Sequence, residues 1–230
     1  MIEGLRHILF PEVCVSCRKL LDPAEKFICT TCFAEFNPFQ GSWAGGEALK
    51  RLVREHFGED QVPAEAWCLY PYRNSGHLHD ALLALKYGGI FPIGTLLGRK
   101  LGELIVSCGN QGSFDGIVPV PLHPLKSIER TYNQAAKIAE GISGVLDVPV
   151  LEKVLVRQHY TDSQTGLTST ARRKNMHDAF LPGRRKCPNR VLLVDDVVTT
   201  GSTLTAAALA LRQSGASSVA FATVALTEKE

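Results

Sequence analysis

The segment that most constrains the fold spans residues 191–203 and reads VLLVDDVVTTGST. Its first four residues form an apolar run, which is typical of a buried strand in a parallel sheet. Two adjacent carboxylates, Asp195 and Asp196, follow the run. After them come two valines and a loop of small, mostly hydroxyl-bearing residues: Val197, Val198, Thr199, Thr200, Gly201, Ser202 and Thr203. A helical pattern of apolar residues begins at Leu204, so the loop lies between the carboxyl end of a strand and the amino end of a helix.

This loop is suited to holding a phosphate group. Free backbone N–H groups and the positive end of the helix dipole point into such a loop. Gly201 permits close approach of the backbone, and the hydroxyls add hydrogen-bond donors. Two acids just before a phosphate cradle indicate a ligand that also carries vicinal hydroxyls or a metal, such as a sugar phosphate. The purely structural alternative is a buried strand with an Asp-rich turn and a helix N-cap at Ser202 or Thr203.

Four of the seven cysteines form two CxxC pairs separated by eleven residues: Cys14, Cys17, Cys29 and Cys32. Four thiolates in two such pairs can converge tetrahedrally on one structural Zn²⁺. Two disulfides are the first alternative, disfavoured without an export signal, and redox chemistry is the second. The module that carries them, residues 1–40, is too small for its own apolar core, so we expect metal binding to drive its folding.

Composition and charge narrow the class of protein. The 230 residues, 45% of them hydrophobic, can bury the core of one enzyme-sized domain with a small addition. No apolar run is long enough to cross a bilayer, and the amino-terminal residues lack the pattern of a signal peptide. We therefore expect a cytoplasmic protein with no membrane insertion.

The formal net charge is only +2, but its distribution is uneven. Residues 153–190 hold nine basic and two acidic residues, a balance of +7 that leaves −5 for the rest of the chain. Such a basic segment can attract pyrophosphate or a nucleic-acid backbone. A solvated loop with scattered charges is the alternative.

Apolar periodicity predicts an α/β architecture. Helices are expected over residues 47–57, 78–87, 92–107 and 134–146, and strands over residues 66–72, 117–120, 148–156, 191–194 and 219–226. Strands that alternate with helices indicate a parallel sheet with ligands at the carboxyl ends of its strands. We expect a zinc-ribbon module at residues 1–40, a helical connector at 41–65 and the α/β domain at 66–230.

A second strand end carries an unusual loop. Residues 119–126 read PVPLHPLK, so that Pro121 and Leu122 lie in a stiff turn and Lys126 follows them. A rigid backbone with exposed N–H groups beside a cation can hold a diphosphate. An ordinary proline-rich turn is the alternative.

Residues 191–203 resemble the phosphoribosyl-pyrophosphate (PRPP) binding motif of type I phosphoribosyltransferases. The resemblance implies a parallel sheet flanked by helices and a ligand such as PRPP or ribose 5-phosphate. It implies that Asp195 and Asp196 contact the ribose hydroxyls and stabilise positive charge at the ribose C1, while residues 197–203 hold the 5′-phosphate. The loop at 119–126 would grip pyrophosphate together with Arg130. Residues 157–175 would close over the site with Arg172, and Mg²⁺ would bridge ligand oxygens.

Further motifs narrow the resemblance to the ComF family of competence-associated, phosphoribosyltransferase-like proteins and the similar GntX-type proteins. They are IVPVPLHPLK, ERTYNQA, LKYGG at 85–89, the segment 157–175 and the cysteine pairs. Thr131 stands where the family usually has glycine, and residues 33–67 contain no second cysteine cluster, so one zinc ion is expected. The resemblance implies a link to DNA uptake, with single-stranded DNA and the competence machinery as partners. An active phosphoribosyltransferase that uses an unidentified base in nucleotide salvage is the alternative.

Overall fold

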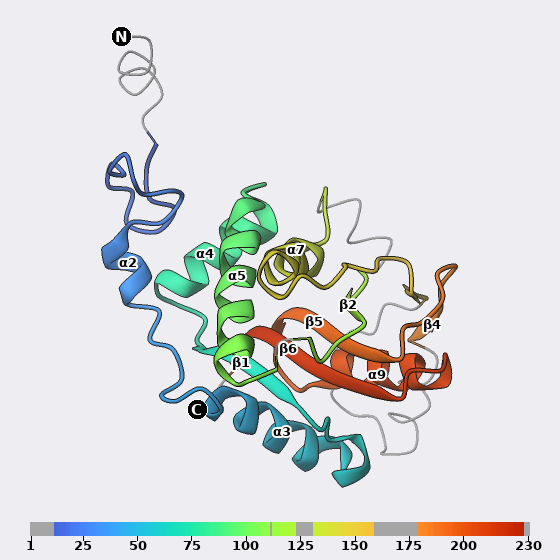
Figure 1. The fold of residues 1–230 in the computed structure, drawn as a ribbon. Coiled ribbons are helices and arrows are strands. Elements are labelled where there is room, and N and C mark those ends of the chain that lie inside the picture. The colour runs from blue at the N-terminus through green and yellow to red at the C-terminus, as the bar shows by residue number, and fades with distance from the viewer. Residues whose placement is uncertain (1–11, 111, 123–130, 159–178, 228–230) are drawn as a thin grey trace.

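The computed structural model describes residues 12–110, 112–122, 131–158 and 179–227. Its centre is a four-stranded sheet in the order β1-β6-β5-β2, and every neighbouring pair of strands is parallel (Figure 1). The strands are β1 (Ala66–Tyr72), β2 (Gly116–Pro119), β5 (Arg190–Val198) and β6 (Ser218–Thr227). The parallel α/β architecture predicted from the sequence is confirmed.

Helices cover both faces of this sheet. One face is covered by α4 (His77–Tyr87), α5 (Pro92–Ser107) and α7 (Gln134–Leu146). The other face is covered by α3 (Ala44–Phe57) and α9 (Ser202–Gln213). Along β5, Leu192 and Val194 belong to the first apolar cluster, and Val191 and Leu193 to the second. Burial on both faces explains why this strand is a continuous apolar run rather than an alternating one.

Two glycines explain how α5 and α7 approach each other so closely. A Cβ atom on Gly98 would lie 2.0 Å from the carbonyl oxygen of Ile138, and one on Gly141 would lie 2.2 Å from that of Thr95. Glycine normally disfavours a helix, but here it permits backbone contact between two helices.

Most of the predicted elements form close to their expected bounds, and the strand expected over residues 148–156 is the main error. Only an isolated bridge joins Val150 to Ile117. The chain then turns through Lys153, which has a positive φ of 65°, before β3 (Leu155–Arg157) pairs antiparallel with β4 (Phe180–Pro182). The left-handed residue interrupts the extended backbone that the apolar pattern suggested.

The strand predicted at 191–194 is also longer than expected. Strand β5 continues to Val198 because its pairing with β6 continues, with Asp195 opposite Thr223 and Val198 opposite Leu226. Both acids therefore lie on the strand and not after it.

The cysteine module, residues 12–36, contains the short helix α2 (Thr30–Ala34) and packs against the body of the molecule. Its apolar residues share one cluster with Leu78 and Leu82 of α4, and the ring of Phe36 meets that of Tyr70 edge-on at 5.5 Å. A short 3-10 helix, η1 (Glu59–Gln61), follows α3. The division of the chain at residues 40 and 65 stays a prediction. Among the described helices, none has the length and apolar character needed to span a membrane.

Candidate functional site

The site lies where the chain leaves two neighbouring strands toward opposite faces of the sheet. From β2 the chain leads to α7 on one face, and from the adjacent β5 it leads to α9 on the other. A crevice at the carboxyl ends of two such strands is the general location of ligands in open α/β sheets. Asp195 and Asp196 are carried to this crevice by β5.

Local hydrogen bonds orient the two acids. The backbone N–H of Asp196 donates to Oδ1 of Asp195 at 2.9 Å, and the N–H of Val197 donates to Oδ1 of Asp196 at 2.6 Å. On the neighbouring strand, the hydroxyl of Thr223 donates to the carbonyl oxygen of Asp196 at 3.1 Å. The backbone therefore uses one oxygen of each carboxylate, Oδ1, and leaves Oδ2 to other partners.

The pKa of Asp195 is raised to about 7. Burial of its carboxyl group is the main cause, and the neighbouring charge of Asp196 adds to it. The backbone N–H of Asp196 and the positive charges of Lys86 and Arg157 act in the opposite direction. Near neutral pH Asp195 can therefore take up or release a proton.

The loop after β5 makes few hydrogen bonds of its own, and the N–H of Ser202 donates to the Thr200 hydroxyl only at a long 3.4 Å. Gly201 adopts a left-handed conformation with φ of 79° and serves as the N-cap of α9, and no side chain caps this helix. The N-cap at Ser202 or Thr203 that the structural alternative required does not form. Thr199, Thr200 and Ser202 are exposed, and the Thr200 hydroxyl reaches only its neighbour Ser202, at 3.1 Å. The first N–H groups of a helix have no partner within it, so an anion can bind here.

The remaining predicted ligand-binding residues differ in how they are placed. Pro121 and Leu122 follow β2, and the N–H of Val120 donates to the carbonyl of Val194 at 2.9 Å, which holds this turn beside β5. Val197 is half-buried, whereas Val198 is buried and pairs with Leu226 in the sheet. Three predicted cations lie outside the described residues: Lys126, Arg130 and Arg172.

The structure adds a residue that the sequence analysis did not assign to the site. Nζ of Lys86, near the end of α4, lies 3.1 Å from Oδ2 of Asp196, and the two side chains are only 19% and 14% exposed. The LKYGG motif was the available signal, because its glycine pair ends the helix and so fixes the place of the cation two residues before it. Its partner is 110 positions away along the chain, beyond the reach of any local pattern.

The four predicted metal ligands converge in the cysteine module. The sulfur atoms of Cys14, Cys17, Cys29 and Cys32 all lie within 4.8 Å of one another, and those of Cys17 and Cys29 are 3.7 Å apart. Tetrahedral coordination with metal–sulfur bonds of about 2.3 Å places sulfurs roughly 3.8 Å apart, so the group fits a metal ion.

The environment of Cys14 favours the thiolate form that a metal requires. Burial raises its pKa, but backbone N–H donors, led by that of Cys29, outweigh burial and bring the pKa to about 6. All four cysteines are free thiols, so neither pair forms a disulfide.

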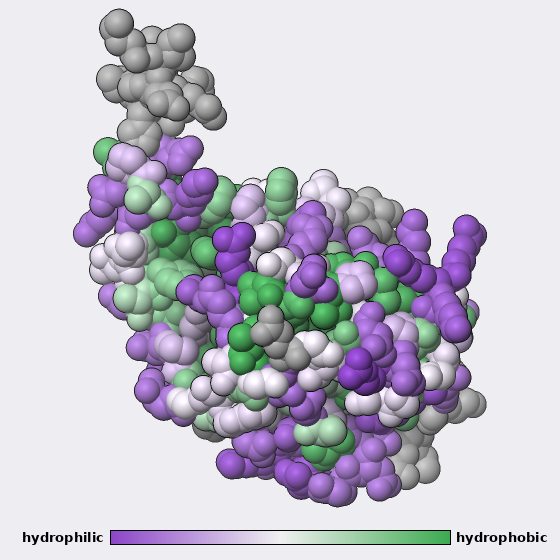
Figure 2. Space-filling model, viewed as in Figure 1, coloured by the Kyte–Doolittle hydropathy of each residue, from purple (hydrophilic) through white to green (hydrophobic). Residues whose placement is uncertain are grey.

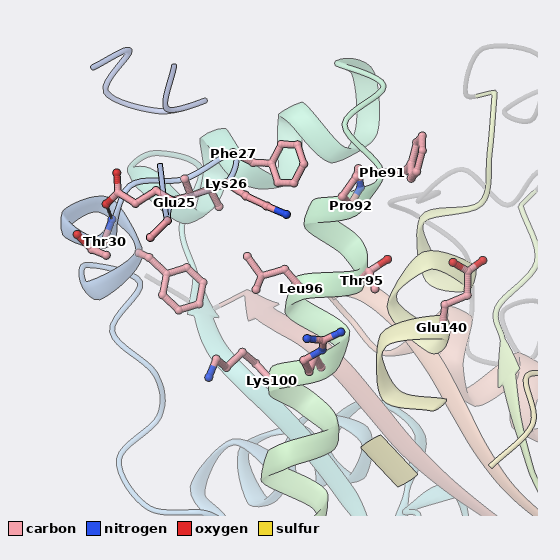
Figure 3. A pocket seen from close by; sticks show the side chains of 14 residues that line it. Glu25, Lys26, Phe27, Thr30, Phe91, Pro92, Thr95, Leu96, Lys100 and Glu140 are labelled. Carbon is pink, nitrogen blue, oxygen red and sulfur yellow. Dashed lines mark hydrogen bonds between the residues drawn. The ribbon is translucent and has the colours of Figure 1, made fainter. Parts of the chain in front are cut away.

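A separate cavity of about 530 Å³ lies between the cysteine module and α5 (Figure 3). Rings of Phe27, Phe33 and Phe91 line it, and Lys26 and Arg99 have no ion-pair partner within the described part of the chain. Phe27 has a positive φ of 66°, uncommon for so large a residue. Figure 2 shows apolar residues gathered where this module meets the body of the molecule. The cavity contains none of the acids or hydroxyls of the strand-end site.

Comparison with known proteins agrees with this geometry. Residues 133–230 match the model of the phosphoribosyl transferase domain. The chain is 31% identical to competence protein F of Haemophilus influenzae over 212 residues, which cover 88% of this chain and 91% of that protein. It is 33% identical to the DNA utilization protein YhgH of Escherichia coli K12 over 108 residues, 46% of each chain.

Similarity to solved structures is weaker. A purine phosphoribosyltransferase from Pyrococcus horikoshii aligns with 58% of this chain and 75% of its own, at 21% identity and a TM-score of 0.34. An amidotransferase from B. subtilis that uses PRPP aligns with 56% of this chain and 25% of its own, at 18% identity and a TM-score of 0.38. These scores are too low to bear on the details of the site.

Proposed function

We propose that this chain, which belongs to the competence protein F family, binds PRPP at the carboxyl ends of β5 and β2. One observation carries the proposal: an exposed loop of hydroxyl residues at the uncapped start of α9 directly follows two acids on a buried strand. An anion site and an acceptor pair at this spacing match the two ends of a ribose 5-phosphate unit.

In this proposal residues 199–203 bind the 5′-phosphate through hydroxyl and backbone donors. Asp195 and Asp196 accept hydrogen bonds from the ribose hydroxyls through the oxygens that the backbone does not use. The turn at Pro121 and Leu122 faces the diphosphate with its backbone, together with Lys126, Arg130 and Arg172 from outside the described residues.

The chain also offers ligands for two metal ions with different roles, one at the strand ends and one in the cysteine module. Carboxylates beside a diphosphate suit Mg²⁺, which is usually held by few protein oxygens and several substrate oxygens, and which neutralises the charge of the diphosphate. The four convergent thiols suit Zn²⁺ as a structural ion.

The same geometry supports catalysis at the ribose C1 as an alternative activity. Departure of pyrophosphate leaves positive charge on the sugar, and a carboxylate held beside it without reorganisation stabilises that charge. The chain would then act as a phosphoribosyltransferase that uses a free base in nucleotide salvage.

Binding is tested by titrating PRPP and Mg²⁺ into the full chain by calorimetry and by following thermal stability. Thr200→Val combined with Ser202→Ala removes two exposed donors, and we expect binding to weaken roughly 10-fold or more, because hydrogen bonds to charged groups are the strong ones. Ser75→Ala, an exposed serine before α4, is the matched control and should bind like the wild type. The proposal would be refuted if PRPP gave no heat of binding with the wild-type protein and did not raise its thermal stability. Pyrophosphate release in the presence of free bases separates the enzyme from the pure binder.

A second role, in handling single-stranded DNA, is favoured by the names of the two relatives and by the surface. Most of the basic segment 153–190 lies outside the described residues, but Arg184, Arg185 and Lys186 are described and exposed in the turn between β4 and β5. The cavity beside α5 adds three aromatic rings and two cations, the groups on which single strands stack and pair. We therefore propose a cytoplasmic protein that meets incoming DNA and the competence machinery.

This role predicts salt-sensitive binding of an oligothymidine, measured by fluorescence anisotropy. Charge reversal of residues 184–186 to glutamate should weaken binding and flatten its salt dependence. Reversal of Arg51 and Arg54 to glutamate serves as the control, because both are exposed on α3 and lie outside this turn and the cavity. If both reversals act equally, the turn is not a DNA contact.

A further inference from the structure

The ion pair between α4 and β5 connects the strand-end site to a part of the chain outside the matched domain. The family model covers residues 133–230, whereas Lys86 lies on α4. Its ammonium group nevertheless contacts one of the two acids at 3.1 Å, in surroundings that are mostly buried. A ligand that binds Asp196 must share or replace its ion pair with Lys86, so any binding mode has to include this cation.

The end of α4 is held in place by contacts to the connection that follows β2. The hydroxyl of Tyr132 donates to the carbonyl oxygen of Leu85, and the rings of Tyr132 and Phe91 meet edge-on at 5.9 Å. Tyr132 directly precedes Asn133, whose amide donates to the carbonyl of Val120 at 3.0 Å. Lys86 therefore contacts the acid pair from a helix end that is anchored at Tyr132, in the described part of the β2–α7 connection, which is the diphosphate side in the proposed binding mode.

We infer that Lys86 is a diphosphate ligand that pairs with Asp196 only while the site is empty, and that it makes the site select PRPP over ribose 5-phosphate. The inference rests on the proposed function. When ribose hydroxyls donate to Asp196, they replace the ammonium group as its partner. The ammonium group then needs another anion.

PRPP supplies that anion and ribose 5-phosphate does not. The diphosphate of PRPP is attached at C1, next to the 2-hydroxyl, and a lysine is a common point-charge ligand for phosphate oxygens. The flexible four-carbon stem of lysine allows its head group to move between neighbouring partners. With ribose 5-phosphate no such partner arrives, so the ligand must compete with Lys86 for Asp196 and gains nothing in return.

A purely structural ion pair predicts a different result. If Lys86 only held Asp196 in place, its loss would weaken the binding of both ligands equally, since both use the same acids. The ratio of the two dissociation constants separates the two roles, and a general loss of stability does not change this ratio.

The experiment measures the binding of PRPP with Mg²⁺ and of ribose 5-phosphate with Mg²⁺ to the full chain by calorimetry. Lys86→Met removes the charge, and Lys86→Gln removes it but keeps a donor for Asp196 in case the methionine variant does not fold. For both we expect PRPP affinity to fall roughly 10- to 100-fold, the worth of a charged hydrogen bond. Ribose 5-phosphate affinity should not fall by more than about 3-fold, and it should rise to the extent that Lys86 competes for Asp196. Lys100→Met, which breaks an exposed pair with Glu103 on α5, is the control and should change neither.

Each outcome decides a separate question. Wild-type protein that binds neither ligand would remove the proposed function itself. Wild-type binding of PRPP with an equal loss of both ligands in the Lys86 variants would make Lys86 a structural residue and overturn the inference. Unchanged PRPP affinity in a folded Lys86→Gln protein would overturn it as well.

Discussion

Two regions of this molecule gather candidate ligand-binding groups, and the backbone holds them in different ways. The acid pair lies on β5, a strand of nine residues that is hydrogen-bonded to a neighbour on each side. In the described part of the cysteine module, regular pairing consists of the isolated bridges Val13–Leu20 and Lys26–Ile28 and the five-residue helix α2. The first region is positioned by the sheet, whereas the second depends on what joins its four thiols.

The strand-end region is therefore ordered before a ligand binds, whereas the cysteine module becomes ordered when its ligand binds. At the strand ends the ligand meets groups that are already oriented, so binding free energy appears mainly as affinity. In the cysteine module, binding of a metal also supplies the free energy that orders the chain. The following predictions test the contrast, beginning with the largest effect.

Removal of two of the four clustered thiols should affect the cysteine module far more than the sheet. Cys29→Ser combined with Cys32→Ser should destabilise residues 12–36 by on the order of 5 kcal/mol or more, because structural zinc sites supply most of the folding energy of small modules. Limited proteolysis with mass spectrometry should show early cuts in the module, while PRPP still stabilises the rest. Cys108→Ser, a half-buried thiol outside the cluster, is the control. Resistance of the double variant to proteolysis would contradict the contrast.

Asp195→Asn should stabilise the folded protein at alkaline pH. The pKa of Asp195 is raised to about 7 by burial and by Asp196, so the unfolded chain ionises this group first and the native state loses stability as pH rises from about 4 through 7. The variant has no such loss. We expect its Tm at pH 8 to exceed that of the wild type by about 2–8 °C, with the difference vanishing below pH 4, as measured by calorimetry. A difference that does not vary with pH would argue against this carboxyl group as the cause.

Gly201→Ala should impair the phosphate loop with a moderate effect on stability. Gly201 has φ of 79°, a conformation that costs an L-residue roughly 1–2 kcal/mol. Thermal unfolding should reveal this cost, and calorimetry should show weaker PRPP binding as the loop relaxes. Gly58→Ala is the control: Gly58 lies between α3 and η1 with φ of 88° and ψ of 169°, a region that only glycine readily adopts, so the variant should cost at least as much stability and leave PRPP binding unchanged. Equal effects of the two variants on binding would show that the loop geometry does not matter.

The smallest effect is expected at the polar contact between the two regions. His77 of α4 lies 2.6 Å from the hydroxyl of Ser16 and 3.1 Å from the carboxylate of Glu35, both in the cysteine module. His77→Ala should loosen this contact by about 1 kcal/mol, seen as faster hydrogen exchange in residues 12–36. PRPP affinity should stay within about 2-fold of the wild type, with His56→Ala on α3 as the matched control. A large loss of affinity would show that the two regions are coupled.

The local parts of the fold could be predicted from the sequence, and the long-range parts could not. The strand–loop–helix of residues 191–213 and the helices at 92–107 and 134–146 follow from apolar periodicity, which acts over a few residues. The contact of Lys86 with Asp196 depends on how α4 is placed over the sheet. The strand predicted at 148–156 does not form because Lys153 is left-handed, and apolar periodicity carries no information about such a residue. Gly98 and Gly141 are a further example. Each glycine disfavours its own helix in a prediction from sequence, but it is needed because the backbone of the other helix lies against it.

The glycine contact between α5 and α7 has a consequence for how the molecule can change shape. Helices in direct backbone contact have no room to slide or rotate past each other, so α5 and α7 should move as one rigid unit over the sheet. Any opening or closing around a bound molecule must then come from the segments on either side of these two helices. The hinges to look for in relaxation or exchange experiments are the Gly88–Gly89 turn on one side and the strand β3 on the other.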